Sequence, residues 1–63
     1  MQKFEIRTVD GTERLWTNGK RKFSIVKVGN WIPAVFDSAS EAYQKVGTCP
    51  INFKVFGIEQ RGN

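Results

Sequence analysis

The side chains that could do chemistry in this chain are cations and aromatic rings rather than the usual catalytic groups. The 63 residues contain no histidine and one cysteine, Cys49. Without an imidazole there is no Ser–His or Cys–His pair, and a single thiol cannot make a zinc site. Asp10 and Glu41 have structural tasks, in a predicted turn and at a predicted helix start. The sequence therefore predicts a protein that is not an enzyme and that needs no metal or cofactor.

Positive charge is the first informative feature. Ten Lys and Arg against six Asp and Glu give a net charge of +4, which favours polyanionic partners. A tight hairpin turn at Asp10-Gly11 would place Arg7 opposite Arg14, and like charges in that position repel unless an anion or a carboxylate lies between them. A phosphate group could occupy that place, or Glu5 could neutralise the pair.

Aromatic side chains near this charge are the second feature. Trp16 would share the face of Arg7 and Arg14, and Lys20, Arg21 and Lys22 follow in the next loop. A stacking surface beside positive charge is the combination that holds nucleic-acid bases and backbones. The alternative is that Trp16 packs under a loop.

A second candidate surface is apolar. Trp31, Val26 and Val28 would form an exposed patch if the opposite sheet face is the buried one, and Pro33 lies nearby. Such a patch usually marks a protein contact. The alternative is that Trp31 and Val26 lie in a second small core beneath the C-terminal strand.

The periodicity of apolar residues predicts an α+β fold with one antiparallel sheet and one short helix packed on one of its faces. The expected order is β-β-β-β-α-β, with strands over residues 4–9, 12–17, 23–28, 31–36 and 51–58 and a helix over 39–46. The first four strands would form a meander, and residues 1–63 would form a single small domain.

Local signals fix several details of this fold. The second hairpin would need a three-residue loop, residues 18–20, to pair Leu15 with Phe23 on the core side. Pro33 cannot donate a ladder hydrogen bond, so its strand would be an edge or be bulged there. Ser38 and Glu41 match a capping box at the helix start. The apolar stripe of that helix would consist of Ala39, Ala42, Tyr43 and Val46.

The remaining composition bounds where the chain works. No segment approaches the roughly 18 apolar residues that span a bilayer, and the first residues lack the apolar run of a signal peptide. A lone cysteine is typical of a reducing compartment. We expect a cytoplasmic protein without a membrane partner, whose oligomeric state is open, a dimer included.

The string Phe36-Asp37-Ser38-Ala39-Ser40-Glu41-Ala42-Tyr43 resembles the end of an AP2/integrase-type DNA-binding domain, in which a three-stranded sheet leads into one helix. In that family the sheet enters the DNA major groove. By position, the resemblance implies contacts from Lys20, Arg21, Lys22, Lys27 and Trp31, and it implies DNA rather than RNA. The strand over residues 51–58 departs from that pattern.

Residues 33–61 are similar in layout to the small phage inhibitor of bacterial RNA polymerase, a compact domain that docks on a host enzyme. That likeness implies a phage or mobile-element accessory protein, which would work in the host cytoplasm.

Two functions follow from these features. The first is a small basic nucleic-acid-binding protein of phage or mobile-element type. Its expected contact residues are Arg7, Arg14, Trp16, Lys20, Arg21, Lys22 and Lys27. The alternative is a protein that binds and inhibits a host protein, such as RNA polymerase or a nuclease, through Trp31, Pro33, Val26 and Val28.

Overall fold

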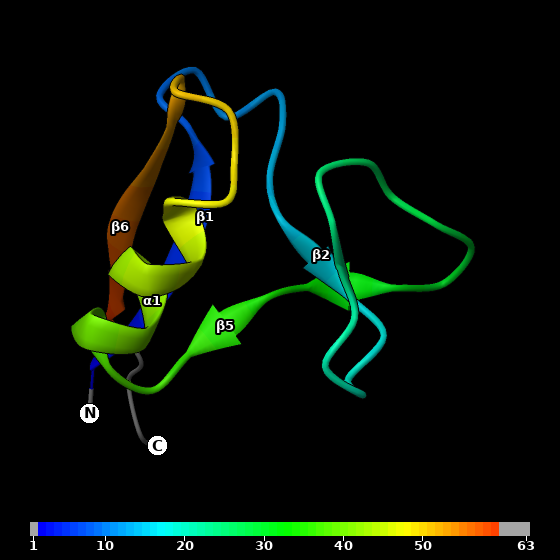
Figure 1. Cartoon of the computed structure of the whole chain (residues 1–63), viewed down its shortest axis with the longest axis horizontal. Coiled ribbons are helices and arrows are strands. Elements are labelled where there is room, and N and C mark those ends of the chain that lie inside the picture. Colours follow the sequence, from blue (N-terminus) through cyan, green and yellow to red (C-terminus); the bar gives the residue numbers. More distant parts are fainter. Residues whose placement is uncertain (1, 60–63) are drawn as a thin grey trace.

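The computed structural model describes residues 2–59 and confirms the α+β class. The elements are β1 (Gln2–Thr8), β2 (Trp16–Thr17), β3 (Phe23–Ser24), β4 (Ile32–Pro33), β5 (Val35–Phe36), α1 (Ala39–Val46) and β6 (Phe53–Glu59). The strands form two antiparallel three-stranded sheets instead of one: sheet A, in the order β5-β1-β6, and sheet B, in the order β3-β2-β4. Figure 1 shows α1 in front of sheet A and sheet B projecting to the other side.

Sheet A is built on the long pairing of β1 with β6. The register runs from Gln2 opposite Glu59 to Thr8 opposite Phe53, and β5 pairs with the other edge of β1 through Phe36 opposite Phe4. Because side chains alternate across a sheet, Phe4, Ile6, Phe36, Phe53 and Val55 share one face of sheet A. The buried core consists of Ile6, Leu15, Ala34, Phe36, Ala42 and Phe53.

The helix begins where the capping signal predicts. The Ser38 Oγ accepts the backbone N–H of Glu41 at 3.2 Å, and α1 ends at Gly47. Ala42 is fully buried and Val46 packs against the core, whereas Tyr43 is 63% exposed, so its place in the predicted stripe is wrong. The side of the two-turn helix that contacts the sheet is therefore narrower than the apolar stripe predicted from the sequence.

The first hairpin has the predicted register but not the predicted length. Arg7 lies opposite Arg14, and the Leu15 N–H donates to the Ile6 carbonyl at 2.9 Å. Beyond this point the strands part, because the Ala34 N–H donates to the Leu15 carbonyl and brings β5 alongside β1. Glu5 therefore faces Val35, and Trp16 pairs with Ser24 and Pro33 in sheet B.

The second hairpin has a larger loop than predicted. Thr17 pairs with Phe23, so the loop spans residues 18–22 and the expected pairing of Leu15 with Phe23 is wrong. Side chains close this loop: the Thr17 Oγ1 donates to the Lys22 carbonyl at 2.8 Å, and the Asn18 Oδ1 accepts the Lys20 N–H at 2.7 Å.

The four-strand meander is also wrong. β2 pairs with both β3 and β4, and the segment expected as one strand over residues 31–36 is divided at Ala34 into β4 and β5, one for each sheet. Pro33 lies in the edge strand β4, as predicted for a residue without an N–H. Ile51, expected to begin the final strand, lies in the preceding turn and is 91% exposed.

Candidate nucleic-acid interface

The net charge of the chain is confined to the segment that forms sheet B. Residues 15–36 contain four of the ten Lys and Arg, namely Lys20, Arg21, Lys22 and Lys27, and none of the six Asp and Glu. The other six cations and the six acidic residues cancel, so this segment alone carries +4. Sheet B and its loops are therefore the positive pole of the molecule.

The facing arginines lie on the face of sheet A turned away from α1, and Glu5 lies between them. Its carboxylate accepts the Arg7 Nε–H at 3.1 Å and an Arg14 guanidinium N–H at 3.3 Å. The Arg7 guanidinium also lies over the ring of Phe56, 3.8 Å from its centroid. The repulsion between the two arginines is thus compensated within the chain.

Trp16 continues this face into sheet B. It lies two residues beyond Arg14 along the chain and is paired with Ser24 and Pro33, so these residues share one side of the sheet. The Lys27 ammonium lies over the indole ring, 5.5 Å from its centroid. Trp16 is half-buried.

The loop between β2 and β3 presents three consecutive cations, Lys20, Arg21 and Lys22, which are all exposed. None of them has a carboxylate within ion-pair distance among the described residues. Arg21 has φ of 68°, in the left-handed region that glycine and asparagine prefer. The backbone of this loop is held in a conformation that costs an arginine free energy.

The anchor of sheet B in the core is Phe23. Its ring stacks on that of Phe36, with centroids 5.9 Å apart, and the Lys45 ammonium of α1 lies 4.5 Å from the Phe23 centroid. Phe23 thereby fixes the position of the basic loop relative to sheet A.

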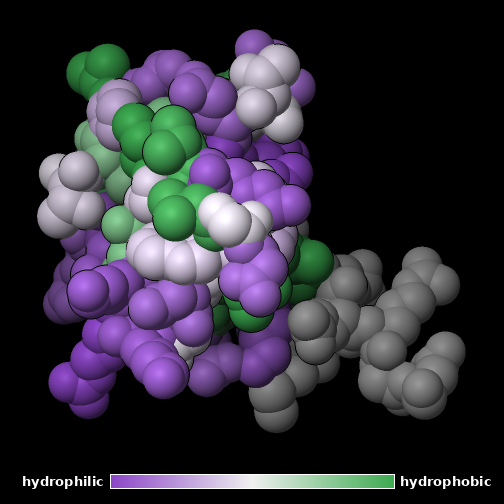
Figure 2. Space-filling model, turned by 90° about the vertical axis from the view of Figure 1, so that its right-hand side faces the viewer, coloured by the Kyte–Doolittle hydropathy of each residue, from purple (hydrophilic) through white to green (hydrophobic). Residues whose placement is uncertain are grey.

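The apolar surface expected for the alternative function lies in the same part of the molecule. Val26 is 58% exposed and Val28 is 44% exposed, and Pro33 is exposed. Trp31 is partly exposed, and the proposed second core under the C-terminal strand is wrong because that strand, β6, belongs to sheet A. Figure 2 shows hydrophobic side chains on this side of the molecule among strongly hydrophilic ones.

Two exposed apolar residues near this surface were not predicted. Ile25 is 36% exposed, and Ile32 is 59% exposed. The turn signal at Gly29-Asn30 and the division of the strand near Pro33 are the local features that end regular pairing here.

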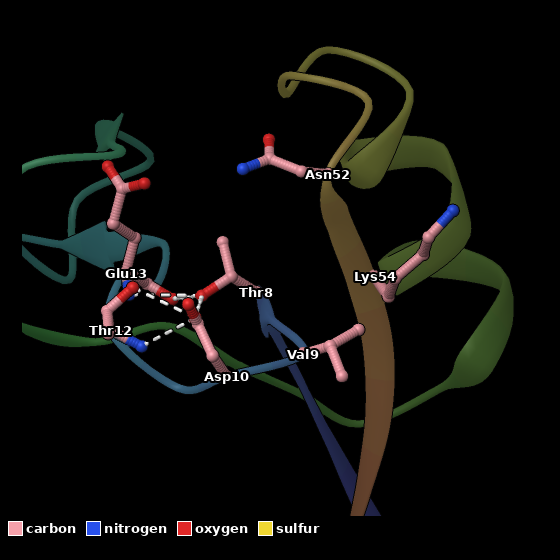
Figure 3. A pocket seen from close by; sticks show the side chains of 7 residues that line it. All are labelled: Thr8, Val9, Asp10, Thr12, Glu13, Asn52 and Lys54. Carbon is pink, nitrogen blue, oxygen red and sulfur yellow. Dashed lines mark hydrogen bonds between the residues drawn. The ribbon is translucent and has the colours of Figure 1, made fainter.

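The turn between β1 and β2 borders a hollow with two acidic residues, Asp10 and Glu13, shown in Figure 3. It is lined by Thr8, Val9, Asp10, Thr12, Glu13, Asn52 and Lys54. Hydrogen bonds from the Thr8 hydroxyl at 2.7 Å and from the Thr12 N–H and hydroxyl at 3.1 and 2.9 Å lower the pKa of Asp10. These bonds close the hairpin turn, so the carboxylate already has a structural task.

Cys49 is the remaining side chain with reactive potential among the described residues. Burial raises the pKa of Cys49, whose thiol lies 3.7 Å from the Lys45 carbonyl oxygen. The described residues contain no group of three or more Cys, Asp and Glu that could hold a metal ion. Within the described range, no helix has the length and apolarity to cross a bilayer.

The chain matches no protein-family model, and searches of curated proteins and of solved structures gave no match either.

Proposed function

We propose that this protein binds a nucleic acid through sheet B and its two loops, as an accessory protein without catalytic activity. The observation that carries this proposal is the charge distribution: residues 15–36 hold the whole net charge of +4 and no acidic residue. Cations without carboxylate partners attract phosphates and release condensed counterions on binding.

The left-handed backbone conformation of Arg21 supports a role of its positive charge in binding. A non-glycine residue in the left-handed region costs about 1–2 kcal/mol, and glycine or asparagine would cost less there. Arg21 is exposed and lines a hollow beside Phe23 and Glu41, but it forms no ion pair among the described residues. Its guanidinium is available to a phosphate, which it binds in bidentate geometry.

The contact surface of this proposal consists of Trp16, Lys20, Arg21, Lys22 and Lys27. Arg7 and Arg14 lie beside it, but their guanidinium groups are engaged by Glu5. We assign them to the stability of sheet A and the flanking part of the surface.

A salt titration tests the proposal. The probe is a labelled oligonucleotide, and its anisotropy is measured between about 25 and 200 mM salt, where a few phosphate contacts change affinity by orders of magnitude. The variant K20Q/K22Q removes two cations of sheet B, and K3Q/K54Q removes two cations of sheet A. Each phosphate contact contributes about 0.7–0.9 to the slope of log K against log salt, so the first variant should lower the slope by about 1.5.

The control variant should leave that slope unchanged. Equal losses in the two variants, or the absence of salt-dependent binding at low ionic strength, would contradict the proposal. Thermal melts of both variants establish that each remains folded.

A second candidate function is favoured by the exposed apolar residues Val26, Val28 and Ile32. A protein that inhibits a host enzyme would bury such residues in its interface. A pull-down from bacterial lysate, with and without nuclease, separates the two functions. A partner that persists after nuclease treatment and is lost in V26K/V28K would favour the inhibitor.

A further inference from the structure

The elements of this protein are poorly shaped for reading a duplex. The strands of sheet B have two residues each, which makes each about 7 Å long. The major groove is about 12 Å wide and 8.5 Å deep and admits a full helix or β-ribbon. A sheet of such short strands cannot follow the groove as a longer three-stranded sheet does.

The helix cannot take this role either. α1 has eight residues, and its inner side packs on sheet A. Its exposed residues include Glu41 and Tyr43, and its basic residue Lys45 is engaged over the Phe23 ring. An acidic residue on the outer side repels the phosphates that line a groove.

The surface of sheet B instead combines charge with apolar contact area. The half-buried indole of Trp16 lies under the Lys27 ammonium, and Val26 and Val28, the chain neighbours of Lys27, are exposed. In a duplex the base faces are occupied by stacking on each other, and only phosphates and base edges are accessible. A single strand offers phosphates and apolar base faces together, which matches both components of this surface.

We infer that the partner is a single-stranded nucleic acid. One base contacts the Trp16 ring, the adjoining phosphate contacts Lys27, and the strand continues along the loop of Lys20, Arg21 and Lys22. This inference rests on the proposed function and adds the strandedness of the partner to it.

The affinities for two oligonucleotide classes test the inference. The single-stranded probes are oligo-dT and oligo-U of about twelve nucleotides, within the range of sites that small single-strand-binding folds occupy. The double-stranded probe is a hairpin duplex with the same number of phosphates. Anisotropy at one low salt concentration should give at least tenfold tighter binding of one or both single strands, and the pair of single strands distinguishes DNA from RNA.

Two variants of Trp16 locate the contact. Trp16→Leu removes the aromatic ring but keeps an apolar side chain, and it should weaken single-strand binding about 5- to 150-fold, the range for the loss of one stacked base. Trp16→Phe keeps a ring and should lose much less. With Trp31→Phe as the background, the remaining indole fluorescence reports on Trp16 and should be quenched by oligo-dT.

The outcomes separate this inference from the function on which it rests. Equal or tighter binding of the duplex would overturn the single-strand inference and leave nucleic-acid binding in place. Failure to bind any of the probes would overturn both. Equal losses in Trp16→Leu and Trp16→Phe, with normal melting of both variants, would refute stacking on this ring.

Discussion

Replacing Glu5 with glutamine tests how the facing arginines are held. The Glu5 carboxylate bridges Arg7 and Arg14 with contacts of 3.1 and 3.3 Å, and its side chain is only 18% exposed. A neutral amide cannot compensate the charges of two guanidinium groups. Its NH₂ group is also a hydrogen-bond donor, and it would face the N–H donors of an arginine. We expect Glu5→Gln to destabilise the folded protein.

The size of the effect follows from the partial burial of the three groups. The arginine side chains are 25% and 32% exposed, so each ion pair lies between a surface pair, at up to about 1 kcal/mol, and a buried charge-assisted bond of about 1.5–3 kcal/mol. Uncompensated like charges opposite each other add a few tenths of a kcal/mol. The total is about 2 kcal/mol, which lowers the melting temperature of a domain of this size by roughly 8–16 °C.

Circular dichroism melts at low and high salt measure this loss, and Glu13→Gln is the matched control. Glu13 is exposed, forms no ion pair among the described residues, and lies in the same hairpin. Similar melting temperatures for the two variants would refute the assigned role of Glu5.

Nucleic-acid affinity is a second readout of the same pair of variants. Both remove one negative charge, so both should raise the affinity for a polyanion equally through the long-range field. A larger gain for Glu5→Gln would place the released arginines in the contact surface.

Three further outcomes follow from local contacts. Ser38→Ala removes the helix cap and should cost about 1 kcal/mol in urea unfolding. The hydrogen bonds from Thr8 and Thr12 lower the pKa of Asp10 in the folded state, so the stability that Asp10 contributes is present above its ordinary pKa of about 3.9 and is lost as pH falls through the lowered value. Asp10→Asn should therefore flatten the dependence of the urea midpoint on pH below about 4, and an unchanged acid limb would contradict this. Because burial raises the pKa of Cys49, its alkylation at pH 8 should be slower in the folded than in the urea-unfolded protein, and equal rates would show an accessible thiolate.

The parts of the fold that sequence predicted correctly depend on short-range signals. The Asp10-Gly11 turn sets the pairing of Arg7 with Arg14, and the Ser38 cap sets the start of α1. In each case the side chains that determine the geometry lie within a few residues of one another, so the local pattern contains the information.

The parts that were wrong depend on contacts distant in the chain. β1 makes its long pairing with β6, about fifty residues away, and nothing in either segment identifies the other as its partner. Neighbouring strands were therefore joined into one meander, whereas Ala34 divides its segment between two sheets. The loop of residues 18–22 is lengthened by the hydroxyl of Thr17, a contact that alternation of apolar residues does not reveal.

The candidate site shows the same division. The sequence predicted that the cations of the β2–β3 loop lie in a loop. It left open whether Glu5 compensates the arginines, and in the structure the Glu5 carboxylate contacts both Arg7 and Arg14. It treated the surfaces around Trp16 and Trp31 as separate alternatives. Because β2 pairs with β4, both surfaces belong to sheet B.

In this arrangement, the residues that stabilise the fold and the residues that carry its net charge lie in different parts of the molecule. Nearly all of the buried core comes from sheet A, α1, Leu15 and Ala34, while the unpaired cations of sheet B are exposed and contribute little to packing. A surface that holds like charges without acidic partners repels itself, and it persists only if the rest of the fold supplies the free energy that offsets this. Sheet A supplies it through its seven-residue pairing and couples it to the basic loop through Phe23, stacked on Phe36. A bound polyanion, as proposed for this surface, would compensate the charge of sheet B.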